Sequence, residues 1–461
     1  MVVQHNMQAM NANRMLNITT SSQSKATEKL SSGYKINRAA DDAAGLSISE
    51  KMRKQIRGLD QASTNAQDGI SAVQTAEGAL TEVHSMLQRM NELATQAANG
   101  TNSESDRQAI QNEIAQLTTE IDRVAETTKF NETYLLKGNG KVSTVKIHAQ
   151  DAGLTGTLTG IGTGTATFKM AALKNGESIS IGSKGYRIGT TVTAIKAQVP
   201  GTTNSIVTIN GTEYKIATKT SAADYQYKQD DLKSIIKDGD KVIIGTQTYI
   251  AMVDANNDGV GDNDGSVISA NQAYKLIKEE LRKASSIGAD PGKEAKVGAA
   301  PTGEYTQTHT QVSFTITEGS VKTTQGLQMG LHVGADADGT NKITFTIDTL
   351  TSAGLGIQNL GIVDNTGAKA TYAIDAIADA LQKVSAQRSA LGAVQNRLEH
   401  TINNLDNVVE NTTSAESAIR DTDMASEMVK YSNNNILTQA GQAMLAQANQ
   451  SNQGVLSLLG Q

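Results

Sequence analysis

The chain has 461 residues, and its 41 Lys and Arg against 47 Asp and Glu give a formal net charge of −6. This mild acidity argues against a nucleic-acid-binding protein, which usually carries a basic excess. Aromatic residues make up 3%, so aliphatic and Met side chains must form the core, which favours helix bundles over a compact enzyme. The absence of Cys excludes disulfides, thiolate metal sites and Cys nucleophiles.

Neither a membrane helix nor a secretory leader is predicted. No apolar run approaches the ~20 residues that a membrane helix needs. The opening MVVQHNMQAM lacks a charged segment followed by an apolar one. If the protein leaves the cell, we expect a route other than the ordinary signal-peptide route.

The first 140 residues predict long paired helices. A helix capped by Asp41 or Asp42 and running from Ala43 to Ala98 would span roughly 84 Å. Within it, apolar residues alternate at spacings of 3 and 4, as in a helix that packs along other helices. These residues are Val73, Ala76, Leu80, Val83, Leu87, Met90, Ala94 and Ala97.

A second helix follows across a short polar loop. Asn99-Gly100 is a stop signal for the first helix. Ser103 and Asp106 form a capping box for the next one, although Glu or Gln is more usual at the acidic position. Its apolar positions again follow a helical period, at Ile110, Ile114, Leu117, Ile121 and Val124. The two segments therefore predict a helical hairpin.

The C-terminal part has the same period. Its seam positions are Ile374, Ile377, Leu381, Val384, Leu391, Leu398 and Leu405, with Arg388 at one of them. Residues 424–459 and the first ~40 residues are capable of forming helices but carry few apolar anchors. Such helices are marginal alone and need partners.

The middle, roughly 141–326, is rich in Thr, Gly and Ile, and it predicts strands. One hairpin pattern recurs, with Ile, a Gly or Asn turn residue and then Tyr, at 181–186, 209–214 and 244–249. A helix is expected around 270–284 and a loop over 288–303. A last hairpin, 331–333 with 343–347, brackets the turn at 336–339. We therefore predict an α+β protein: a long helical coiled-coil or rod bundle from both termini, with a β-rich inserted outer domain.

The two ends resemble bacterial flagellin, over about residues 1–140 and 327–461. The most specific stretches are Leu30–Leu59, Leu87–Leu117, Arg397–Leu405 and Ser426–Gln450. The middle carries no recognisable family signature, which is itself typical of a region that varies among flagellins.

The resemblance implies a domain plan and a function. Residues 1–40 and 425–461 would form an inner coiled coil that is disordered in the monomer. Residues 41–140 and 327–424 would form a rod with a β-hairpin, and 141–326 a variable outer domain. Subunits would assemble into a hollow helical filament for motility, because a heterologous contact that does not close gives an open filament.

The resemblance also implies partners and a location. These are other copies of the chain, an export chaperone, the filament cap, hook-associated proteins and host Toll-like receptor 5. Type III export would place the protein outside the cell, in the flagellar filament. Neither a cofactor, nucleic acid binding nor membrane insertion is expected.

A receptor and filament interface is implied on the first helical hairpin. Arg89, Leu93 and Gln96 lie on one helix stripe, Leu87 extends it, and Glu113 is on the partner helix. These residues match the flagellin patch that Toll-like receptor 5 grips and that subunits bury against one another. An Arg beside Leu with a nearby carboxylate is a plausible interface hot spot. The alternative is a filament contact only.

The last helix is implied to bind the export chaperone, or else to serve only the filament core. Its apolar residues are Met424, Met428, Ile436, Leu437, Met444 and Leu445.

One loop in the middle carries a metal-binding pattern. Asp254, Asn256, Asp258, the carbonyl of Val260 and Asp262 occupy EF-hand positions, with Gly259 at the sharp turn. Position 12 is Gly rather than the bidentate Glu, so any calcium site would be weak. We favour the alternative, a solvated Asn/Asp/Gly turn.

No motif predicts an enzyme. His5, His84, His148, His309, His332 and His400 are scattered, and the chain has no HExxH, GxSxG or Walker motif. Two rival functions remain: a hook–filament junction protein with similar helical ends, and an adhesin or glycan-binding module that acts through the β-rich middle.

Overall fold

The computed structural model describes residues 6–302 and 310–459, and side chains up to Ser451. The chain divides into two compact units. The first comprises Met1–Ile70, Gly330–Thr344 and Gln395–Gln461. The second comprises Ser71–Met329 and Phe345–Val394. Two long helices contribute residues to both units.

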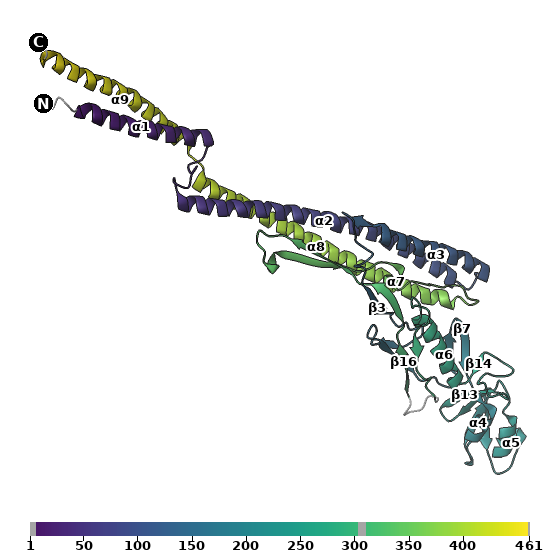
Figure 1. The fold of residues 1–461 in the computed structure, drawn as a ribbon. Helices are drawn as coiled ribbons and strands as arrows, with labels where there is room; N and C mark the ends of the chain where they lie inside the picture. Colours follow the sequence, from purple (N-terminus) through teal and green to yellow (C-terminus); the bar gives the residue numbers. More distant parts are fainter. Residues whose placement is uncertain (1–5, 303–309, 460–461) are drawn as a thin grey trace. The chain divides into compact units, whose positions relative to one another are not determined.

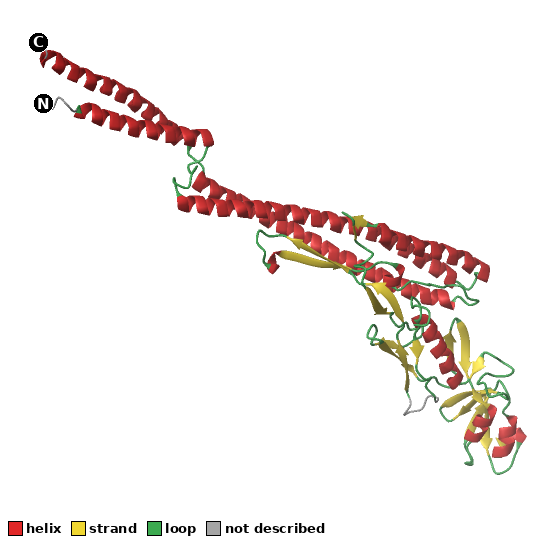
Figure 2. Ribbon diagram, in the orientation of Figure 1, coloured by secondary structure: helices red, strands yellow, loops and turns green. Residues whose placement is uncertain are grey.

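Helices dominate both ends of the chain, and strands gather in its middle (Figure 2). The helices are α1 (Met7–Ser32), α2 (Ala43–Ala98), α3 (Glu104–Thr127), α4 (Val192–Gln198), α5 (Gln229–Ile235), α6 (Ala270–Ser285), α7 (Ser352–Leu355), α8 (Ala368–Arg420) and α9 (Met424–Leu459). Short 3₁₀ turns are η1 (Ala222–Asp224) and η2 (Gly339–Asn341).

In the first unit, α1 and α9 lie side by side (Figure 1). Asn6 caps α1 by accepting the N–H of Ala9, at 2.9 Å. Gly33 ends the helix at φ +77°, a left-handed conformation that favours Gly. The predicted helices at both termini are thus present.

The start of α2 agrees with the sequence prediction. The carboxylate of Asp42 accepts the N–H of Gly45 at 2.8 Å, so it satisfies a donor of the first turn. Asp41 instead accepts the backbone N–H groups of Asn37 and Arg38, at 3.1 and 2.9 Å. Of the two candidate caps, Asp42 is therefore the one that α2 uses.

In the second unit, α2 and α3 form the predicted hairpin. We call the eight apolar positions of α2 the hairpin seam, and all of them are fully buried: Val73, Ala76, Leu80, Val83, Leu87, Met90, Ala94 and Ala97. The capping box of α3 is present, with Ser103 and Asp106 satisfying each other's backbone N–H groups. Arg388, the charged seam residue of α8, lies 3.8 Å from Glu77.

Amide and carboxylate side chains tie irregular segments to these helices. Gln111 accepts the N–H of Ile362 and donates to the carbonyl of Leu360, at 2.7 and 2.9 Å. Asp122 accepts the N–H and hydroxyl of Ser352, at 2.7 and 2.8 Å, and so satisfies the first turn of α7. The segment between the central region and α8 is therefore fixed by specific polar contacts.

The strands are short. They are β1 (Lys129–Phe130), β2 (Thr133–Tyr134), β3 (Val142–Lys146), β4 (Thr157–Thr159), β5 (Thr165–Ala171), β6 (Ser178–Ile181), β7 (Lys184–Ile188), β8 (Thr190–Thr191), β9 (Ile206–Ile209), β10 (Thr212–Ile216), β11 (Gln226–Tyr227), β12 (Lys241–Ile244), β13 (Gln247–Met252), β14 (Val267–Ile268), β15 (Lys296–Val297), β16 (Gln311–Thr317), β17 (Ser320–Thr324), β18 (Leu327–His332) and β19 (Lys342–Ile347).

Within the described residues, the strands form small sheets. The largest has the order β11-β10-β9-β12-β13-β8, and a three-stranded sheet has the order β14-β7-β6. A four-stranded sheet has the order β15-β16-β5-β4. The pairs β1-β2, β17-β3 and β18-β19 complete the set. Residues 288–303, expected as a loop, contribute the two-residue strand β15, which pairs with the edge of β16.

The predicted hairpin pattern is confirmed at all three places. β6 and β7, β9 and β10, and β12 and β13 are each joined by two residues. The backbone at Gly182, Asn210 and Gly245 has positive φ. Two-residue hairpin loops need that conformation, which explains the recurring Gly or Asn.

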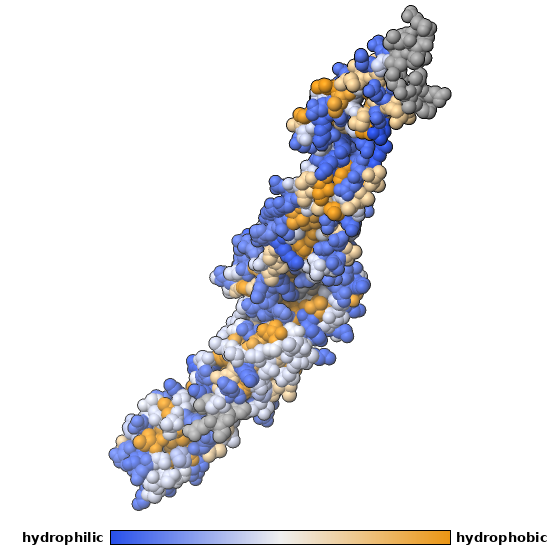
Figure 3. Space-filling view, turned by 90° about the vertical axis from the view of Figure 1, so that its left-hand side faces the viewer, coloured by the Kyte–Doolittle hydropathy of each residue, from blue (hydrophilic) through white to orange (hydrophobic). Residues whose placement is uncertain are grey.

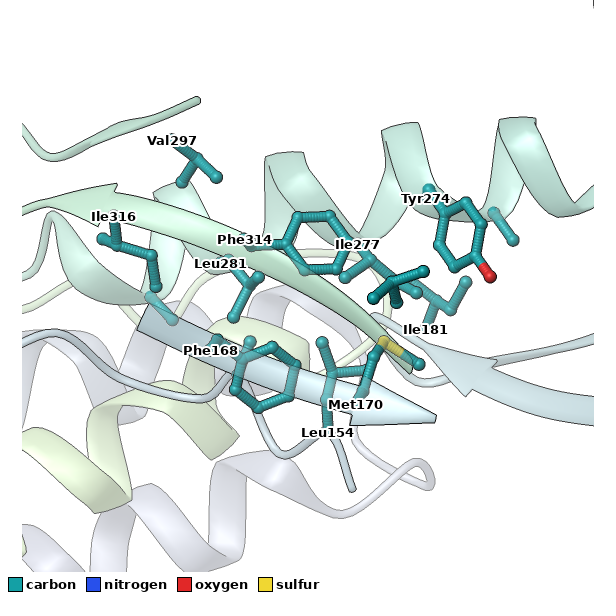
Figure 4. Packing of buried hydrophobic residues seen from close by; sticks show 14 of the residues in the cluster. Leu154, Phe168, Met170, Ile181, Tyr274, Ile277, Leu281, Val297, Phe314 and Ile316 are labelled. Carbon is teal, nitrogen blue, oxygen red and sulfur yellow. The ribbon is translucent and has the colours of Figure 1, made fainter. Parts of the chain in front are cut away.

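The main core of the central region lies between α6 and strands β5 and β16. Figure 4 shows Phe168 and Phe314 from these strands, with Ile277 and Leu281 of α6. The rings of Phe168 and Phe314 are 6.3 Å apart. Tyr274 is fully buried, and its hydroxyl accepts the N–H of Leu173 at 2.9 Å. Two of the four Phe residues of the chain, together with Tyr274, thus lie in this core.

Candidate functional site: the terminal helices and an exposed face of the helical hairpin

We call α1 and α9 the terminal pair. Within the described side chains, Ala26 is the one residue of α1 that is buried. Large apolar residues of both helices are about half exposed or more: Met7, Met10, Met15, Ile18, Met424, Met428, Val429, Ile436, Leu437 and Met444. Hydrophobic patches alternate with hydrophilic ones on the surface in Figure 3. Exposed apolar surface of this extent indicates an interaction site.

The two helices enclose an open groove of about 610 Å³. Its apolar lining includes Met15 and Leu16 of α1, and Leu437 and Met444 of α9. Gly441 allows the close approach, since an added Cβ would lie 3.3 Å from the Leu16 side chain. The helices therefore pack closely at one point and leave a groove beside it.

Polar contacts fix the register of the terminal pair. Asn6 Nδ2 donates to the carbonyl of Ala448 at 3.0 Å. The hydroxyl of Thr438 donates to Oε1 of Gln23 at 3.2 Å. These few bonds position α9 along α1, whereas most of its apolar side chains have no contact inside the chain that buries them.

Arg420 joins the segments that follow α1 and precede α9. Its guanidinium lies 4.8 Å from the ring centre of Tyr34, and its Nη1 donates to Glu50 at 2.7 Å. This hydrogen bond lowers the pKa of the Glu50 carboxyl. Two backbone hydrogen bonds also connect these segments. The N–H of Lys35 donates to the carbonyl of Arg420 at 2.7 Å, and the N–H of Thr422 donates to the carbonyl of Gly33 at 2.9 Å.

The predicted receptor patch is built around Arg89 on α2. Its Nε and Nη2 both donate to Oε1 of Glu113 on α3, at 3.0 and 2.9 Å. Nη1 donates to Glu92 at 3.2 Å, a partner that the sequence analysis missed although it lies one helical turn away. The hydrogen bonds that Arg89 donates to Glu113, and then to Glu92, raise the pKa of Arg89. Gln96 is also exposed, so these polar groups form one surface.

The two leucines of the predicted patch are not on that surface. Leu87 is fully buried and Leu93 is 1% exposed. Leu87 belongs to the hairpin seam, where the 3–4 period directs it toward the neighbouring helices. The interface stays a prediction: of its five residues, Arg89, Gln96 and Glu113 are exposed in the structure, and the two leucines are packed beneath them.

Arg107, which the sequence analysis did not single out, is buried beside the loop that joins α2 to α3. Its guanidinium donates to the carbonyls of Ala97 and Asn99 at the end of α2, at 2.9 and 3.2 Å. It also donates to the carbonyl of Asp364, at 3.1 Å. A cation is favourable at a helix C-terminus, where carbonyls lack partners. Arg107 thus fixes the helical hairpin that presents Arg89.

In the acidic loop at 254–265, side-chain oxygens accept hydrogen bonds from the backbone of the same loop. Asp254 accepts the N–H groups of Asp258 and Gly259, at 3.1 and 3.0 Å. Asp262 accepts the N–H of Ala255 at 2.8 Å, and Asn256 accepts that of Asp258 at 3.0 Å. Val260, whose carbonyl was the predicted ligand, forms an isolated antiparallel β-bridge with Ile268. This geometry is that of an Asx-rich turn. Calcium binding here stays a prediction.

A titratable cluster lies where the central region meets α8. His148 Nδ1 is 3.4 Å from Asp379, and Gln150 donates to the same carboxylate at 2.8 Å. Burial works against ionisation of Asp379, but the bonds from His148 and Gln150 lower its pKa overall. Asp375 has no such donors, and burial, followed by Asp151 and Asp379, raises its pKa to about 6. Lys383, whose pKa burial lowers, donates to the carbonyl of Leu355 at 3.2 Å.

The described residues hold no cluster of three or more His, Cys, Asp and Glu side chains suited to a metal ion. Among the scattered histidines, His5 and His309 lie outside the described residues. No described helix is long and apolar enough to cross a membrane.

Two family models match the helical ends of the chain. The bacterial flagellin N-terminal helical region matches residues 3–141, and the bacterial flagellin C-terminal helical region matches residues 374–459. A flagellin of Clostridium tyrobutyricum is 41% identical over 98% of this chain and 100% of its own length. The chain belongs to the bacterial flagellin family.

A second sequence relative and a solved structure provide two further comparisons. A flagellin of Halalkalibacterium halodurans is 35% identical, over 100% of both chains. The solved structure of FliC from Burkholderia pseudomallei is 19% identical, with a TM-score of 0.25, covering 71% of this chain and 99% of that one. The family assignment rests on the sequence relatives.

As a flagellin, the chain is a structural subunit of the bacterial flagellar filament. The predicted fold is confirmed in its main features, with long helices from both termini and a strand-rich region between them.

Proposed function

We propose that the terminal pair makes the innermost contacts of the filament. Residues 1–40 and 425–461 would order on assembly, 41–140 and 327–424 would form the rod, and 141–326 would face outward. The observation that carries this proposal is the exposure of apolar residues such as Met15, Ile436 and Met444 on helices that bury almost nothing internally. Burial of these side chains by neighbouring subunits supplies the driving force.

Seeded assembly followed by electron microscopy tests this proposal. Wild-type protein is expected to give long uniform filaments. Ile436→Ser removes an apolar contact and is expected to reduce elongation strongly, whereas Gln442→Ser on the same helix keeps it. Short capped rings, or a persistent monomer with seeds present, would favour the junction-protein alternative.

Recognition of the monomer by Toll-like receptor 5 is proposed for the surface of Arg89, Gln96 and Glu113. Its support is the exposed Arg89–Glu113 pair, in which two guanidinium nitrogens donate to one carboxylate oxygen across the two helices. Arg89→Ala should weaken receptor binding. Arg123→Ala is the matched control, because Arg123 is also exposed and pairs with Glu120 on α3. Equal affinity of Arg89→Ala and wild type would count against this surface.

Binding of an export chaperone is proposed for α9. Met424, Met428, Ile436, Leu437 and Met444 are exposed, whereas Leu445 is half-buried in the terminal pair. A chaperone that covers the exposed residues would prevent premature assembly. Deletion of residues 424–461 should abolish chaperone binding, and unchanged binding would assign the chaperone to another segment.

We further propose that the chain is secreted by type III export and contacts the filament cap and hook-associated proteins. It acts without catalysis or a cofactor, in keeping with a structural family and with the absence of HExxH, GxSxG and Walker motifs in the sequence. Calorimetric titration with calcium tests the remaining loop prediction. Heat that is lost in Asp258→Asn would support a site, and no heat at about millimolar calcium, the range of weak extracellular sites, would remove it.

A further inference from the structure

The three hairpins of the central region belong to three repeats of one plan. We call them the first, second and third units of the central region, and they are distinct from the two compact units of the whole chain. Each hairpin, β6-β7, β9-β10 or β12-β13, is followed in the chain by a strand of two residues and then a helix. The short strands are β8, β11 and β14, and the helices are α4, α5 and α6. The recurring tyrosines, Tyr186, Tyr214 and Tyr249, occupy equivalent positions in the second strand of each hairpin.

The first and third units exchange their short strands. β8, from the first unit, pairs in parallel with β13 of the third, with Thr190 opposite Ala251. β14, from the third unit, pairs in parallel with β7 of the first, with Ile268 opposite Ile188. In the second unit, β11 stays on its own hairpin and pairs with β10. Every hairpin thus receives a third strand at the same place.

The first strands of two hairpins also pair with each other. β9 and β12 are antiparallel, with Thr208 opposite Ile243 at the centre of the paired residues. Thr208 and Ile243 are equivalent, since each precedes the last residue of its strand, Ile209 or Ile244. The two units are therefore related by a local two-fold arrangement of the kind found in isologous dimers.

The first strand of the remaining hairpin, β6, is an edge strand with no such partner in the described structure. Ser180 of β6 occupies the position of Thr208 and Ile243. The N–H of Arg187 in β7 donates to the carbonyl of Ser266, on the side of β14 and away from β6. Ser178 lies opposite Arg187, so the two form a pair without mutual hydrogen bonds, and the N–H and carbonyl of Ser178 point away from β7. The same alternation directs the N–H and carbonyl of Ser180 outward.

β6 lacks the usual protection of a sheet edge. Its sequence, Ser-Ile-Ser-Ile, has no charge, Pro or bulge within the strand. Ser178 and Ser180 are exposed, while Ile181 is buried in the core formed with α6. In the described structure, the other edge strands of the β14-β7-β6, β11…β8 and β15…β4 sheets are only two or three residues long.

We propose that β6 pairs with β6 of a second copy of this chain, antiparallel about a two-fold axis, with Ser180 opposite Ser180. The partner is a second copy because the chain already uses this strand-to-strand contact between β9 and β12, and because an antiparallel pair of identical strands is self-complementary. With Ser180 on the axis, three residues of each β6 face the other strand, Ile179 opposite Ile181 and Ser180 opposite Ser180, so the contact is weak and needs a high subunit concentration. The contact is independent of the terminal pair.

Cysteine cross-linking of the full chain tests the proposal, and the absence of natural Cys makes each variant carry a single thiol. Opposed Cα atoms in an antiparallel pair are about 4.5–5.5 Å apart, within the range of a disulfide. Ser180→Cys is therefore expected to give disulfide-linked dimers on mild oxidation of the free subunits at high concentration. Ser183→Cys, in the exposed turn after β6, is the control, because its two copies would be about 20 Å apart along the strands.

A charge variant supplies the second measurement. Ser180→Lys places like charges opposite each other and is expected to weaken the self-association of subunits, followed by sedimentation, by about tenfold or more. The exposed position of Ser180 predicts an unchanged thermal midpoint for each variant, which is checked by circular dichroism. Equal cross-linking at 180 and 183, no cross-linking at 180, or unchanged self-association of Ser180→Lys would overturn the proposal.

Discussion

The hairpin seam lies on a long helix, and the terminal pair consists of two long helices. Both carry apolar residues at helical spacings, yet their surroundings differ. All eight seam residues are fully buried within one chain. In the terminal pair, α1 buries Ala26 alone among its described residues, and residues such as Ile436 are more than half exposed. The seam is a complete core within one chain, whereas the terminal pair leaves most of its large apolar side chains exposed, as its proposed role in the filament requires. Amphipathic spacing thus predicts a buried face without showing which chain buries it.

The largest effect is expected in the seam itself. Leu80→Ala removes a fully buried side chain and should lower the free energy of unfolding by about 2–5 kcal/mol. Ile436→Ala, in the terminal pair of the free subunit, should change it by less than about 0.5 kcal/mol. Denaturant titrations followed by circular dichroism compare the two. Similar losses would show that the terminal pair is as tightly packed as the seam.

Arg107→Ala should follow, with a loss of about 2–3 kcal/mol, because three carbonyls at the end of α2 and before α8 would lose a charged donor. The same denaturant titration measures it. Arg107→Lys keeps the charge but not the fork of donors, so an intermediate loss is expected. If Arg107→Ala left the free energy of unfolding unchanged, the seam would close without this contact.

A smaller, pH-dependent effect is expected at Asp375. Its folded-state pKa of about 6 lies above the ordinary value of 3.8, so its contribution to stability is complete below about pH 4 and is lost as the pH rises through 6. Asp375→Asn should therefore stabilise the fold at about pH 7.5 by about 1–2 kcal/mol, after allowance for solvent screening of a half-exposed carboxylate.

Thermal unfolding at both pH values measures the Asp375 effect. The gain should disappear at about pH 4, where the wild-type carboxyl is protonated in both states. The charged neighbours Asp151 and Asp379 are unchanged in the variant and serve as a common background. A gain that is equal at both pH values would refute the assigned ionisation.

The smallest effect belongs to the exposed surface. Arg89→Ala breaks ion pairs with Glu113 and Glu92 in which every partner is about half exposed or more, so the expected change in stability is within about 0.5 kcal/mol. Arg123→Ala should behave alike. A larger loss for Arg89→Ala would assign it a structural role, and its effect on receptor binding would then need Arg89→Lys as a further test.

Local signals predicted much of the fold. The seam, the capping box at Ser103 and the three hairpin turns depend on residues close in sequence, and all are present. Burial of Leu93 was not predicted, since family resemblance names residues without saying which atoms are exposed. Arg107 was missed because its partners include the distant Asp364, and the strand exchange because β8 and β13 are about sixty residues apart.

The exchanged strands have a consequence for the order in which the central region becomes native. The second unit of the central region, with β9, β10, β11 and α5, contains its own hairpin, third strand and helix. It is therefore complete once residues 206–235 are available. The first unit must wait for β14 and the third must recruit β8, so these two become native together. Such long-range closure slows folding. A chain that ended anywhere between 253 and 266 would lack β14, so β7 would keep β6 but lose its parallel neighbour. Proteolytic nicking in this segment would therefore report on the first and third units of the central region at once.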